Sequence, residues 1–504
     1  MAQLTKPFPP GDYDLVLVGS GPGGLQLSYS LSRLGIRHAV LSADEGPGGM
    51  FRKWPLFQRM LSWTKPHIGP DHQSREFERY DWNSLLAEEP ANRSLMATLM
   101  DGSSSFPSRP EMERGLTTFA ERAGVAVRYA CRWEATRRDG ERFILETTDG
   151  PYRCRRAVFA VGVAEPWLPP IPGMDEVPHY GECGRPEAYA GKRVFIIGKQ
   201  NSGFEIASGL LAWAGTIVLA SPGPTRLSVN TKTLVGVRAR YVQPYEDHVL
   251  SGGVLVLDAA IDRVSKRGDV YLVATRSSVD GTARDFEVDT VIAATGFVAP
   301  LRDLPALGVA TFGQSRLPAQ TAYWESVSVP GIFFAGTLSQ GAQGLRKHGV
   351  PSNSGAVHGH RYNARLLARH IAERHFGVKP TSTPVEEADA VRYLLAELTR
   401  APELWHQRSY LARALLLEDD GRLLDAGIVP LSAFVDRSGP DGVAVAVETN
   451  AQGETYPAVY RRQNGQISEH LLTPHPLHDY ETAEHRKALA SVLAPLLGAV
   501  AASA

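Results

Sequence analysis

Cysteine is scarce in this sequence, and its scarcity excludes several kinds of chemistry. The 504 residues contain three cysteines, Cys131, Cys154 and Cys183, and no Cys-x-x-Cys pair. This spacing rules out a disulfide scaffold, a cysteine zinc site and a reductase that relays electrons through a dithiol. No complete metal-ligand, nucleophile-triad or ATP-binding P-loop signature is present, so we expect no metal.

The sequence also lacks an excess of either charge and lacks long apolar runs, and these absences bear on its binding partners and its location in the cell. Lys and Arg number 53 and Asp and Glu number 54, so the formal net charge is −1, with no electrostatic footprint for nucleic acid or a membrane surface. No apolar run reaches the ~20 residues of a transmembrane helix, and the first residues lack the apolar core of a secretory signal. We expect no nucleic-acid partner, no membrane association and a cytoplasmic location.

Glycine, by contrast, is abundant, with 48 residues in 504. An apolar run leads directly into GSGPGG at 19–24, and a helical pattern and a second apolar run follow. In such a unit Gly19 allows a tight turn, Gly21 lets the backbone approach a pyrophosphate, and Gly24 lets the helix pack close to the strand. The pattern predicts a dinucleotide site, whereas the alternative is a glycine-rich turn without a ligand.

The end of the second apolar run is the expected place for a ribose contact. Dinucleotide sites of this kind carry an acidic side chain ~20 residues after the glycines. Here the run ends at Ser42, and Asp44 and Glu45 follow. Ser42 can donate and accept a hydrogen bond, and Asp44 or Glu45 could supply the carboxylate. The alternative is that both charges are solvated in a loop.

A second strand, glycine turn and helix begins at Lys192. Its turn reads GKQNSG at 198–203, so Gln200 replaces the middle glycine. That side chain holds a pyrophosphate further from the backbone, but the helix N-terminus and Ser202 remain to bind it. The turn therefore predicts a second nucleotide site, with a vestigial fold as the alternative.

A basic residue after the next strand bears on the choice of nucleotide. Arg226 could meet a 2′-phosphate and so favour NADPH over NADH, and Lys232 is the alternative candidate. An exposed loop arginine without a ligand is at least as good an interpretation. Two dinucleotide sites in one chain indicate two redox cofactors, because a nicotinamide delivers hydride to a flavin.

The length and the order of these patterns predict the organisation of the chain. At ~150 residues per domain, we expect about three domains. The fold class predicted is α/β, with two Rossmann-like dinucleotide-binding domains and a small α+β C-terminal extension. In the extension we expect helix over 385–417, then a strand meander with an Asn464-Gly465 hairpin turn, and a final helix. The predicted boundaries are 1–170 and 301–378 for the FAD domain, 171–300 for the NAD(P)H domain and 379–504 for the extension.

Several motifs together resemble a known family. They are GSGPGG, PGGMF, FPSRPEMERGLTTFAERAGV, FAVG with PWLPPIPG, GKQNSGFEIA, IAATGF and PGIFFAGT, and they cover roughly residues 11–377. Their order is similar to that of the two-dinucleotide-binding-domain flavoproteins. Within these the chain most resembles class B flavoprotein monooxygenases, which include flavin-containing monooxygenases, amine N-hydroxylases and Baeyer–Villiger enzymes.

The resemblance implies FAD in the first domain and NADPH or NADH in the second. In such enzymes the nicotinamide reduces FAD, O2 adds to the flavin, and one oxygen atom passes to a soft nucleophile or a carbonyl. The implied FAD contacts are Gly19, Gly21, Gly24, Ser42, Asp44, Gly48, Gly49, Met50, Gly162, Gly336 and Thr337. The implied NAD(P)H contacts are Gly198, Gln200, Asn201, Ser202, Gly203, Arg226, Thr295 and Gly296.

The chain departs from the family pattern at several positions. Thr337 stands where the family has an acidic residue in its last FAD motif, and the first Ala-Thr-Gly element has Val161 in its middle. The Baeyer–Villiger fingerprint is absent. The Lys of flavin-containing monooxygenases near the flavin is retained as Lys65, whereas the Asn before it is not. These departures make oxygen transfer a weaker implication than flavin binding.

Two segments supply candidate catalytic and substrate residues. Residues 50–82 are rich in aromatic and basic side chains, and from them we select Trp63 and Lys65 as catalytic and His67 as substrate-binding. The alternative for this segment is an aromatic-rich structural excursion.

The second segment is 340–362. Arg346 could bind a substrate carboxylate through its fork, His348 could shuttle a proton at neutral pH, and Asn353 is a further substrate candidate. His358 and His360 are two residues apart and do not share a helix face, which argues against a metal.

Three functions remain open on the sequence alone. The first is an FAD- and NAD(P)H-dependent monooxygenase of a small molecule, with N-oxygenation of an amine or amino-acid-like substrate favoured. The second is a non-oxygenating flavin dehydrogenase or oxidase. The third is a flavoprotein subunit that assembles through its C-terminal extension. A homodimer is compatible with each of them.

Overall fold

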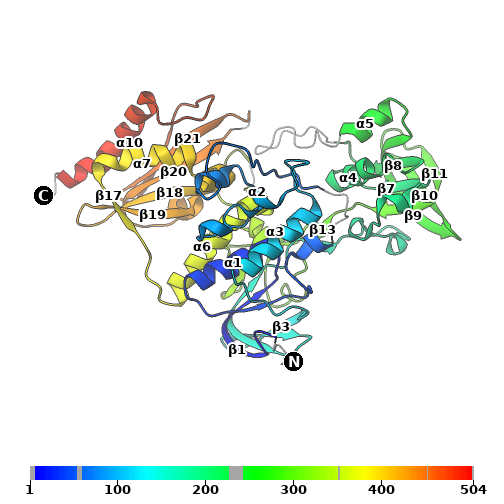
Figure 1. The fold of residues 1–504 in the computed structure, drawn as a ribbon, viewed down its shortest axis with the longest axis horizontal. Coiled ribbons are helices and arrows are strands. Elements are labelled where there is room, and N and C mark those ends of the chain that lie inside the picture. The colour runs from blue at the N-terminus through cyan, green and yellow to red at the C-terminus, as the bar shows by residue number, and fades with distance from the viewer. Residues whose placement is uncertain (1–5, 54–58, 226–241, 350–351, 451, 502–504) are drawn as a thin grey trace.

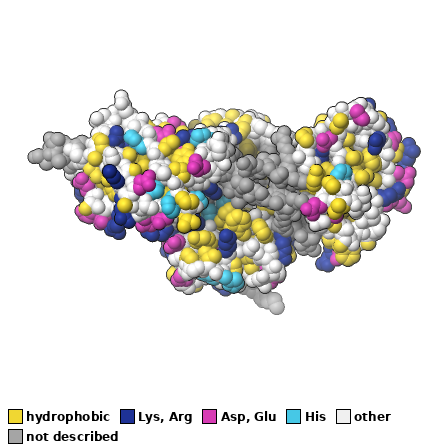
Figure 2. Space-filling model, turned by 90° about the horizontal axis from the view of Figure 1, so that it is seen from above, with side chains coloured by type: hydrophobic (Ala, Val, Ile, Leu, Met, Phe, Trp, Pro, Cys, Tyr) yellow, Lys and Arg dark blue, Asp and Glu magenta, His cyan; other side chains and the backbone are white. Residues whose placement is uncertain are grey.

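The structure, a computed structural model, describes residues 6–53, 59–225, 242–349, 352–450 and 452–501. Figure 1 shows three parts in a row. The part containing the N-terminus and α1 lies in the centre, the part built on β7 to β12 lies on one side, and the C-terminal part lies on the other. Acidic and basic side chains are interspersed on the face shown in Figure 2.

The central part is built on a six-stranded sheet in the order β2-β1-β5-β4-β3, with β16 also pairing with β5. The middle strands are parallel, and Leu15 to Leu17 of β1 are fully buried because both faces of the sheet are covered. The strands are β1 Gly11–Val18, β2 Ala39–Leu41, β3 Trp133–Asp139, β4 Arg142–Thr147, β5 Tyr152–Phe159 and β16 Ile332–Phe334. The helices are α1 Pro22–Arg33, α2 Leu95–Leu99, α3 Arg109–Arg122 and α6 Val357–His375.

A second six-stranded sheet has the order β11-β10-β9-β8-β7-β12. Its parallel strands β7 and β8 flank α4, so the chain contains two strand, glycine turn, helix and strand units, as the sequence predicts. The strands are β7 Arg193–Ile197, β8 Thr216–Ser221, β9 Val254–Arg267, β10 Val270–Ser277, β11 Ala283–Val288 and β12 Thr290–Ala293. The helices are α4 Asn201–Leu210 and α5 Val242–Val249.

Two crossing segments join these parts, and they pair with each other. Strand β6, Glu165–Pro166, runs antiparallel to β13, Phe297–Val298. Beside this ribbon Gly296 accepts hydrogen bonds from the Trp167 amide at 3.0 Å and from His179 Nε2 at 2.9 Å. The ribbon therefore fixes where the chain leaves and re-enters the central part. After it comes a second short hairpin, β14 Thr311–Phe312 and β15 Leu317–Pro318.

The C-terminal extension is an antiparallel sheet in the order β17-β19-β18-β20-β21-β22, with helices packed on it, so its predicted α+β class is confirmed. The hairpin turn predicted at Asn464 and Gly465 also forms, with φ of 51° and 74°. The strands are β17 Thr383–Val385, β18 Leu411–Leu417, β19 Leu423–Pro430, β20 Gly442–Thr449, β21 Thr455–Gln463 and β22 Gln466–Leu471. The helices are α7 Glu387–Arg400, α8 Pro402–His406, α9 Leu431–Asp436 and α10 Ala483–Ala501.

The prediction of helix over 385–417 is wrong at its C-terminal end. Residues 411–417 form β18, which pairs with β19 on one side and β20 on the other. Their sequence, LARALLL, favours helix by intrinsic propensity, but burial between two strands overrides that preference. In the rest of the segment α7 and α8 are helical, whereas Val385 belongs to β17 and residues 407–410 lie outside the helices.

The extension is packed tightly on the central part. A single apolar core contains Leu27 and Leu367 from the central part and Leu394, Leu411 and Val445 from the extension. At the edge of this core Arg75 binds both Glu397 and Glu403 at 2.8 Å. The two parts therefore share buried surface and a buried charge cluster.

Arg75→Met should lower the free energy of unfolding by about 2–3 kcal/mol, because it leaves Glu397 and Glu403 buried with less compensation. Glu403 keeps Arg365 at 3.6 Å, which limits the loss. Urea denaturation measures this difference. Arg392→Met, which removes an exposed pair with Asp389, is the control and should change stability by less than about 0.5 kcal/mol. Equal effects of the two substitutions would contradict the assignment.

Candidate dinucleotide sites

A cavity of about 680 Å³ opens at the carboxyl ends of the central strands and reaches the second part. It contains the position over the N-terminus of α1, which is where parallel sheets of this kind bind ligands. Of the FAD contacts that the family resemblance implies, the lining contains Gly19, Gly21, Ser42, Asp44, Gly49, Met50, Gly162, Gly336 and Thr337.

The first glycine turn is shaped by close backbone contacts. Gly19 has φ of +116°, and a Cβ atom there would lie 2.4 Å from the Ala160 carbonyl oxygen. A Cβ atom on Gly24 would lie 2.0 Å from the Gly19 carbonyl oxygen. At Gly21, by contrast, a Cβ atom would meet nothing within 4 Å, so this residue faces the cavity. The geometry matches the three roles inferred for these glycines from their spacing.

Sequence reasoning missed one glycine of this turn. A Cβ atom on Gly23 would lie 2.2 Å from the Cα atom of Gly336, which starts the segment after β16. The two glycines therefore bring the return segment directly onto α1. The signal was present as the adjacent pair Gly23 and Gly24, but spacing alone does not reveal a partner more than 300 residues away.

Beside the first glycine turn, hydroxyl and carboxylate groups line the cavity. The Ser20 hydroxyl donates to Ser42 Oγ at 2.8 Å, and Ser42 Oγ also accepts from the Asp44 amide at 3.2 Å. Asp44 lines the cavity and pairs with Lys53 at 3.2 Å. Nearby, Gly48 donates its amide to the Ser20 carbonyl at 3.1 Å, which ties the 48–50 turn to the first glycine turn.

The second turn repeats the geometry of the first. Gly198 also has φ of +116°, and a Cβ atom there would lie 2.4 Å from the Ala294 carbonyl oxygen. A Cβ atom on Gly203 would lie 2.3 Å from the Gly198 carbonyl oxygen. Gln200 and Asn201 begin α4, and the buried Asn201 Oδ1 has no hydrogen-bond partner among the described residues. An orphaned acceptor at a helix N-terminus fits a site that is completed by a ligand.

A buried lysine in this turn is the second feature that sequence reasoning missed. Lys199 is inaccessible to solvent and forms an ion pair with Asp258 on β9. Burial lowers the pKa of Lys199 to about 8. The lysine within GKQNSG is visible in the sequence, but its burial and its ion pair could not be predicted. Its partner, Asp258, lies on a strand 59 residues further along the chain.

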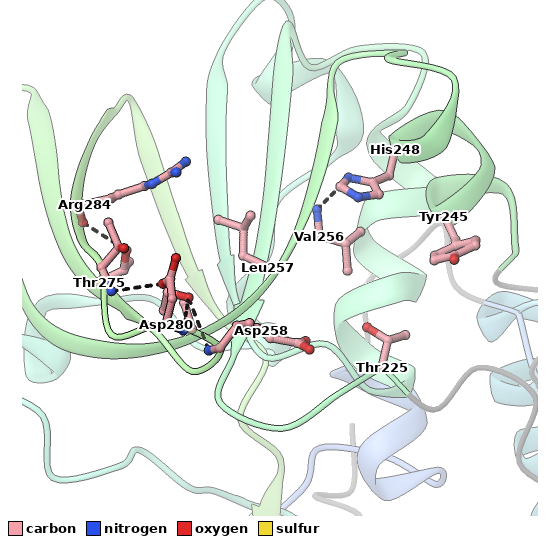
Figure 3. A pocket seen from close by; sticks show the side chains of 13 residues that line it. Thr225, Tyr245, His248, Val256, Leu257, Asp258, Thr275, Asp280 and Arg284 are labelled. Atoms are coloured by element: carbon pink, nitrogen blue, oxygen red, sulfur yellow. Dashed lines mark hydrogen bonds between the residues drawn. The ribbon is translucent and has the colours of Figure 1, made fainter.

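A cavity of about 460 Å³ lies beside this ion pair, with Asp258 in its lining. Figure 3 shows Tyr245 and His248 on the α5 side of it and Thr275 and Arg284 on the opposite side. Arg226 and Lys232, the candidates for a 2′-phosphate contact, lie outside the described residues. Thr295 lies on the second crossing segment, where its hydroxyl donates to the Trp167 carbonyl.

The first cavity ends between the two dinucleotide-binding parts. This end is lined by Glu205 on α4 and Phe297 on β13, together with Leu61 and Ser62 from the aromatic-rich segment before α2. The Tyr180 hydroxyl donates to Glu205 at 2.9 Å. None of these side chains was predicted, because only the interdomain arrangement brings them to the cavity.

Two buried histidines also line the cavity, His358 and His360 at the start of α6. The His358 ring packs on Trp82 at 4.6 Å, and its Nδ1 has no hydrogen-bond partner among the described residues. Burial, reinforced by nearby positive charge, lowers the pKa of His358 to about 3. Burial lowers the pKa of His360 to about 4, with a smaller opposing effect of the Ser354 backbone. Both rings are therefore neutral at pH 7.

The structure places the six predicted catalytic and substrate residues outside the described lining of this cavity. The Trp63 ring packs at a tilt against the Trp82 ring, with their centroids 4.3 Å apart. Lys65 lies over the Trp63 ring and is exposed, as is His67. The other three lie where the return segment meets the solvent or the C-terminal extension. Arg346 is exposed, His348 contacts the Tyr456 hydroxyl at 3.1 Å, and Asn353 donates to the His406 carbonyl at 2.6 Å.

The cysteines offer no reactive thiol. Cys131 and Cys154 are fully buried, and Cys183 is partly buried. Burial raises the pKa values of Cys154 and Cys183 to about 12, so neither forms the nucleophilic thiolate at neutral pH. Within the described ranges no group of His, Cys, Asp and Glu side chains is arranged to hold a metal, and no helix there has the length and apolarity needed to cross a membrane.

Comparison with known proteins gives one family and a consistent set of folds. Residues 16–336, more than half of the chain, match the pyridine nucleotide-disulphide oxidoreductase family. FAD-dependent oxidoreductase domain-containing protein 2 of Mus musculus is 28% identical, and the match covers 81% of this chain but only 65% of that protein.

Solved structures extend the comparison to the fold. Bacillithiol disulfide reductase of Bacillus cereus has a TM-score of 0.55 at 21% identity, covering 72% of this chain and 100% of that one. A flavin-containing monooxygenase of Stenotrophomonas maltophilia has a TM-score of 0.52 at 22% identity, covering 72% and 98%. The same fold thus occurs in a disulfide reductase and in a monooxygenase.

Gly21→Ala and Gly24→Ala should separate ligand binding from folding. Gly24→Ala forces a Cβ atom onto the Gly19 carbonyl and should cost about 2 kcal/mol of stability. Gly21→Ala, at an ordinary extended φ of −72°, should leave stability within about 1 kcal/mol of the wild type but weaken dinucleotide binding about tenfold, because a methyl group projects into the cavity. Denaturation curves and cofactor titration measure both effects, and a strongly destabilised Gly21→Ala would contradict this geometry.

The buried histidines predict a pH dependence of stability. The unfolded chain protonates histidine near pH ~6.5, whereas folded His358 and His360 do so only near 3 and 4. The free energy of unfolding therefore keeps its full value above pH ~6.5. At lower pH it decreases, by about 1 kcal/mol for each histidine at pH 5.5. Urea denaturation at pH 7.5 and 5.5 tests this, with His360→Gln as the control that should show a smaller loss. An equal loss in both proteins would show that His360 takes no part.

Proposed function

The chain belongs to the pyridine nucleotide-disulphide oxidoreductase family, and we propose that it is an FAD- and NAD(P)H-dependent monooxygenase of a small molecule. One observation carries the proposal. Two glycine turns of the same geometry begin the helices of two Rossmann-like parts, the first turn lines a cavity that reaches the second part, and the three cysteines are buried or partly buried. The family makes the protein a flavin-dependent oxidoreductase, and the chemistry of its acceptor is the open part of the proposal.

The first cavity fits FAD. Gly19, Gly21 and Gly24 leave the N-terminus of α1 free of side chains, so the backbone there can bind a pyrophosphate. Ser42 and Asp44 would meet the adenosine ribose, and the flavin ring would then extend toward the end of the cavity lined by Gly336, Thr337 and His358. When bound, FAD accepts hydride from a nicotinamide and reacts with O2.

The second turn fits a nicotinamide dinucleotide. The α4 N-terminus supplies positive charge for a pyrophosphate, and the orphaned Asn201 Oδ1 supplies an acceptor for a hydroxyl group of the nucleotide. The cavity beside Asp258 would hold the adenosine end, with Tyr245 and the hydroxyl of Thr275 on its walls. The nicotinamide end would point toward the shared region lined by Glu205 and Phe297.

The cysteines favour oxygen transfer over disulfide reduction. A disulfide reductase of this fold that relays electrons through protein thiols needs an accessible dithiol. This chain has no Cys-x-x-Cys pair, and no cysteine belongs to the described lining of the cavity. Electrons from the flavin must then pass directly to oxygen or to a bound substrate. Neutral His358, Leu61 and Phe297 supply uncharged surface to the lining of the cavity.

The cavity favours an amine as the substrate. Arg346, inferred from the sequence to bind a carboxylate, lies at the surface away from the cavity lining. The lining contains several ionisable side chains, among them Arg59, Glu165 and Arg302. Glu205, at the interdomain end, is a carboxylate that can accept hydrogen bonds from an amine or ammonium group. Leu61, Phe297 and Pro300 beside it would pack against an apolar body. N-oxygenation of an apolar amine is therefore the reaction that the proposal favours.

Anaerobic reduction followed by addition of O2 tests the proposal. The purified protein should be yellow, bleach with NADPH or NADH, and then convert an amine to its N-oxygenated product with about one nucleotide oxidised per product. Lys199→Met leaves Asp258 in the second cavity without its ion-pair partner, so this control should weaken nucleotide binding about tenfold while leaving the FAD content unchanged. Reoxidation that yields only stoichiometric hydrogen peroxide with every amine tested would favour a flavin oxidase instead, and absence of bleaching would overturn the proposal.

A further inference from the structure

We propose that Gln407, in the C-terminal extension, is a positioning residue for the flavin end of the cavity. Gln407 follows α8 directly and is fully buried. It does not belong to the cavity lining itself. It acts through hydrogen bonds to two turns that do line the cavity, and the inference rests on the proposed binding of FAD there.

Gln407 bonds the 353–355 turn from both ends of its amide. Its Oε1 accepts the Asn353 amide at 2.9 Å, and its Nε2 donates to Ser354 Oγ at 3.1 Å. Ser354 is also fully buried, and Gly355 next to it lines the cavity together with Ala356. The position of this turn is therefore set by a side chain of the extension.

A second branch of the same network reaches the 336–339 turn. Gln407 Nε2 donates to Asn363 Oδ1 at 2.8 Å, and Asn363 Nδ2 donates to Ser339 Oγ at 3.0 Å. The Ser339 hydroxyl in turn donates to the Gly336 carbonyl at 2.7 Å. Gly336 lines the cavity and lies against Gly23 of the first glycine turn.

The burial of this network makes its geometry specific. Gln407, Ser354, Ser339 and Asn363 are each at most 2% exposed, so water does not replace a lost partner. Removing the central amide leaves donors and acceptors on both turns without partners, and such turns relax or shift. Because both turns form one wall of the cavity, a shift in either turn changes the shape of the cavity and the binding of a ligand in it.

Other contacts beside the network hold the extension against the central part. Helix α8 lies against residues 76–79, where Arg79 donates to the Thr399 carbonyl at 2.7 Å and lies over the Trp405 ring. These contacts hold the extension in place, and the hydrogen bonds of Gln407 then fix the position of the cavity wall relative to the extension. The role inferred for residues 379–501 is therefore to complete the cofactor site.

Gln407→Leu and Arg79→Met test the inference as a matched pair at one interface. Each removes hydrogen bonds between the extension and the central part, but only Gln407 bonds the cavity turns. FAD titration of the apoprotein should show about tenfold weaker binding for Gln407→Leu and less than about twofold for Arg79→Met, and the midpoint potential of the bound flavin should shift only in Gln407→Leu. Thermal denaturation of both variants separates these effects from loss of stability.

Gln407→Glu keeps the test decisive if Gln407→Leu does not fold. A buried glutamate retains an acceptor for the Asn353 amide and, once protonated, a donor for Asn363. Its FAD affinity relative to the wild type should therefore improve as the pH is lowered from 8 to 6. Wild-type affinity and potential in both Gln407 variants would overturn the inference alone. Failure of the wild-type protein to bind FAD would overturn the proposed function together with it.

Discussion

The structure depends on the contact of backbone with backbone at the two glycine turns. At each turn the strand, the helix and a crossing segment approach so closely that a Cβ atom would lie 2.0 to 2.4 Å from a carbonyl oxygen. This packing leaves the helix N-terminus bare, and a bare N-terminus at the edge of a parallel sheet is a site for a phosphate. The same close approach at Gly23 and Gly336 joins the return segment to the first turn. The contact between Gly23 and Gly336 therefore also positions the part of the cavity wall that the return segment forms.

Much of this could be predicted from the sequence, because the constraints are local. Gly19, Gly24, Gly198 and Gly203 are required by contacts within one strand, turn and helix, so their spacing reveals the fold. The remaining features depend on partners that are distant in sequence. The Lys199–Asp258 pair, the neutral His358 and the Gln407 network exist only after the parts have docked. The strand at 411–417 was missed for the same reason, since its neighbours override its helical composition.

The structure places the implied FAD contacts and the predicted substrate residues in different surroundings. Motif residues lie on rigid elements, so the implied FAD contacts fall on the cavity with few exceptions. Arg346, His348 and Asn353 lie on the segment between two such elements, and that segment is drawn toward the solvent and the C-terminal extension. Glu205 and Phe297 reach the cavity instead, from the second part. Proximity in sequence to a cofactor motif therefore does not by itself bring a residue to the cavity.

The central claim is that two equivalent turns hold two dinucleotides whose reactive ends meet between the parts. A crystal structure of the protein with FAD and NADP⁺ tests it most directly. We expect one pyrophosphate over Gly21 at the start of α1, a second over Gln200 at the start of α4, and both reactive rings near Glu205, Phe297 and His358. A structure in which the second turn is empty at saturating nucleotide, or in which the flavin ring lies away from Gly336 and His358, would contradict it.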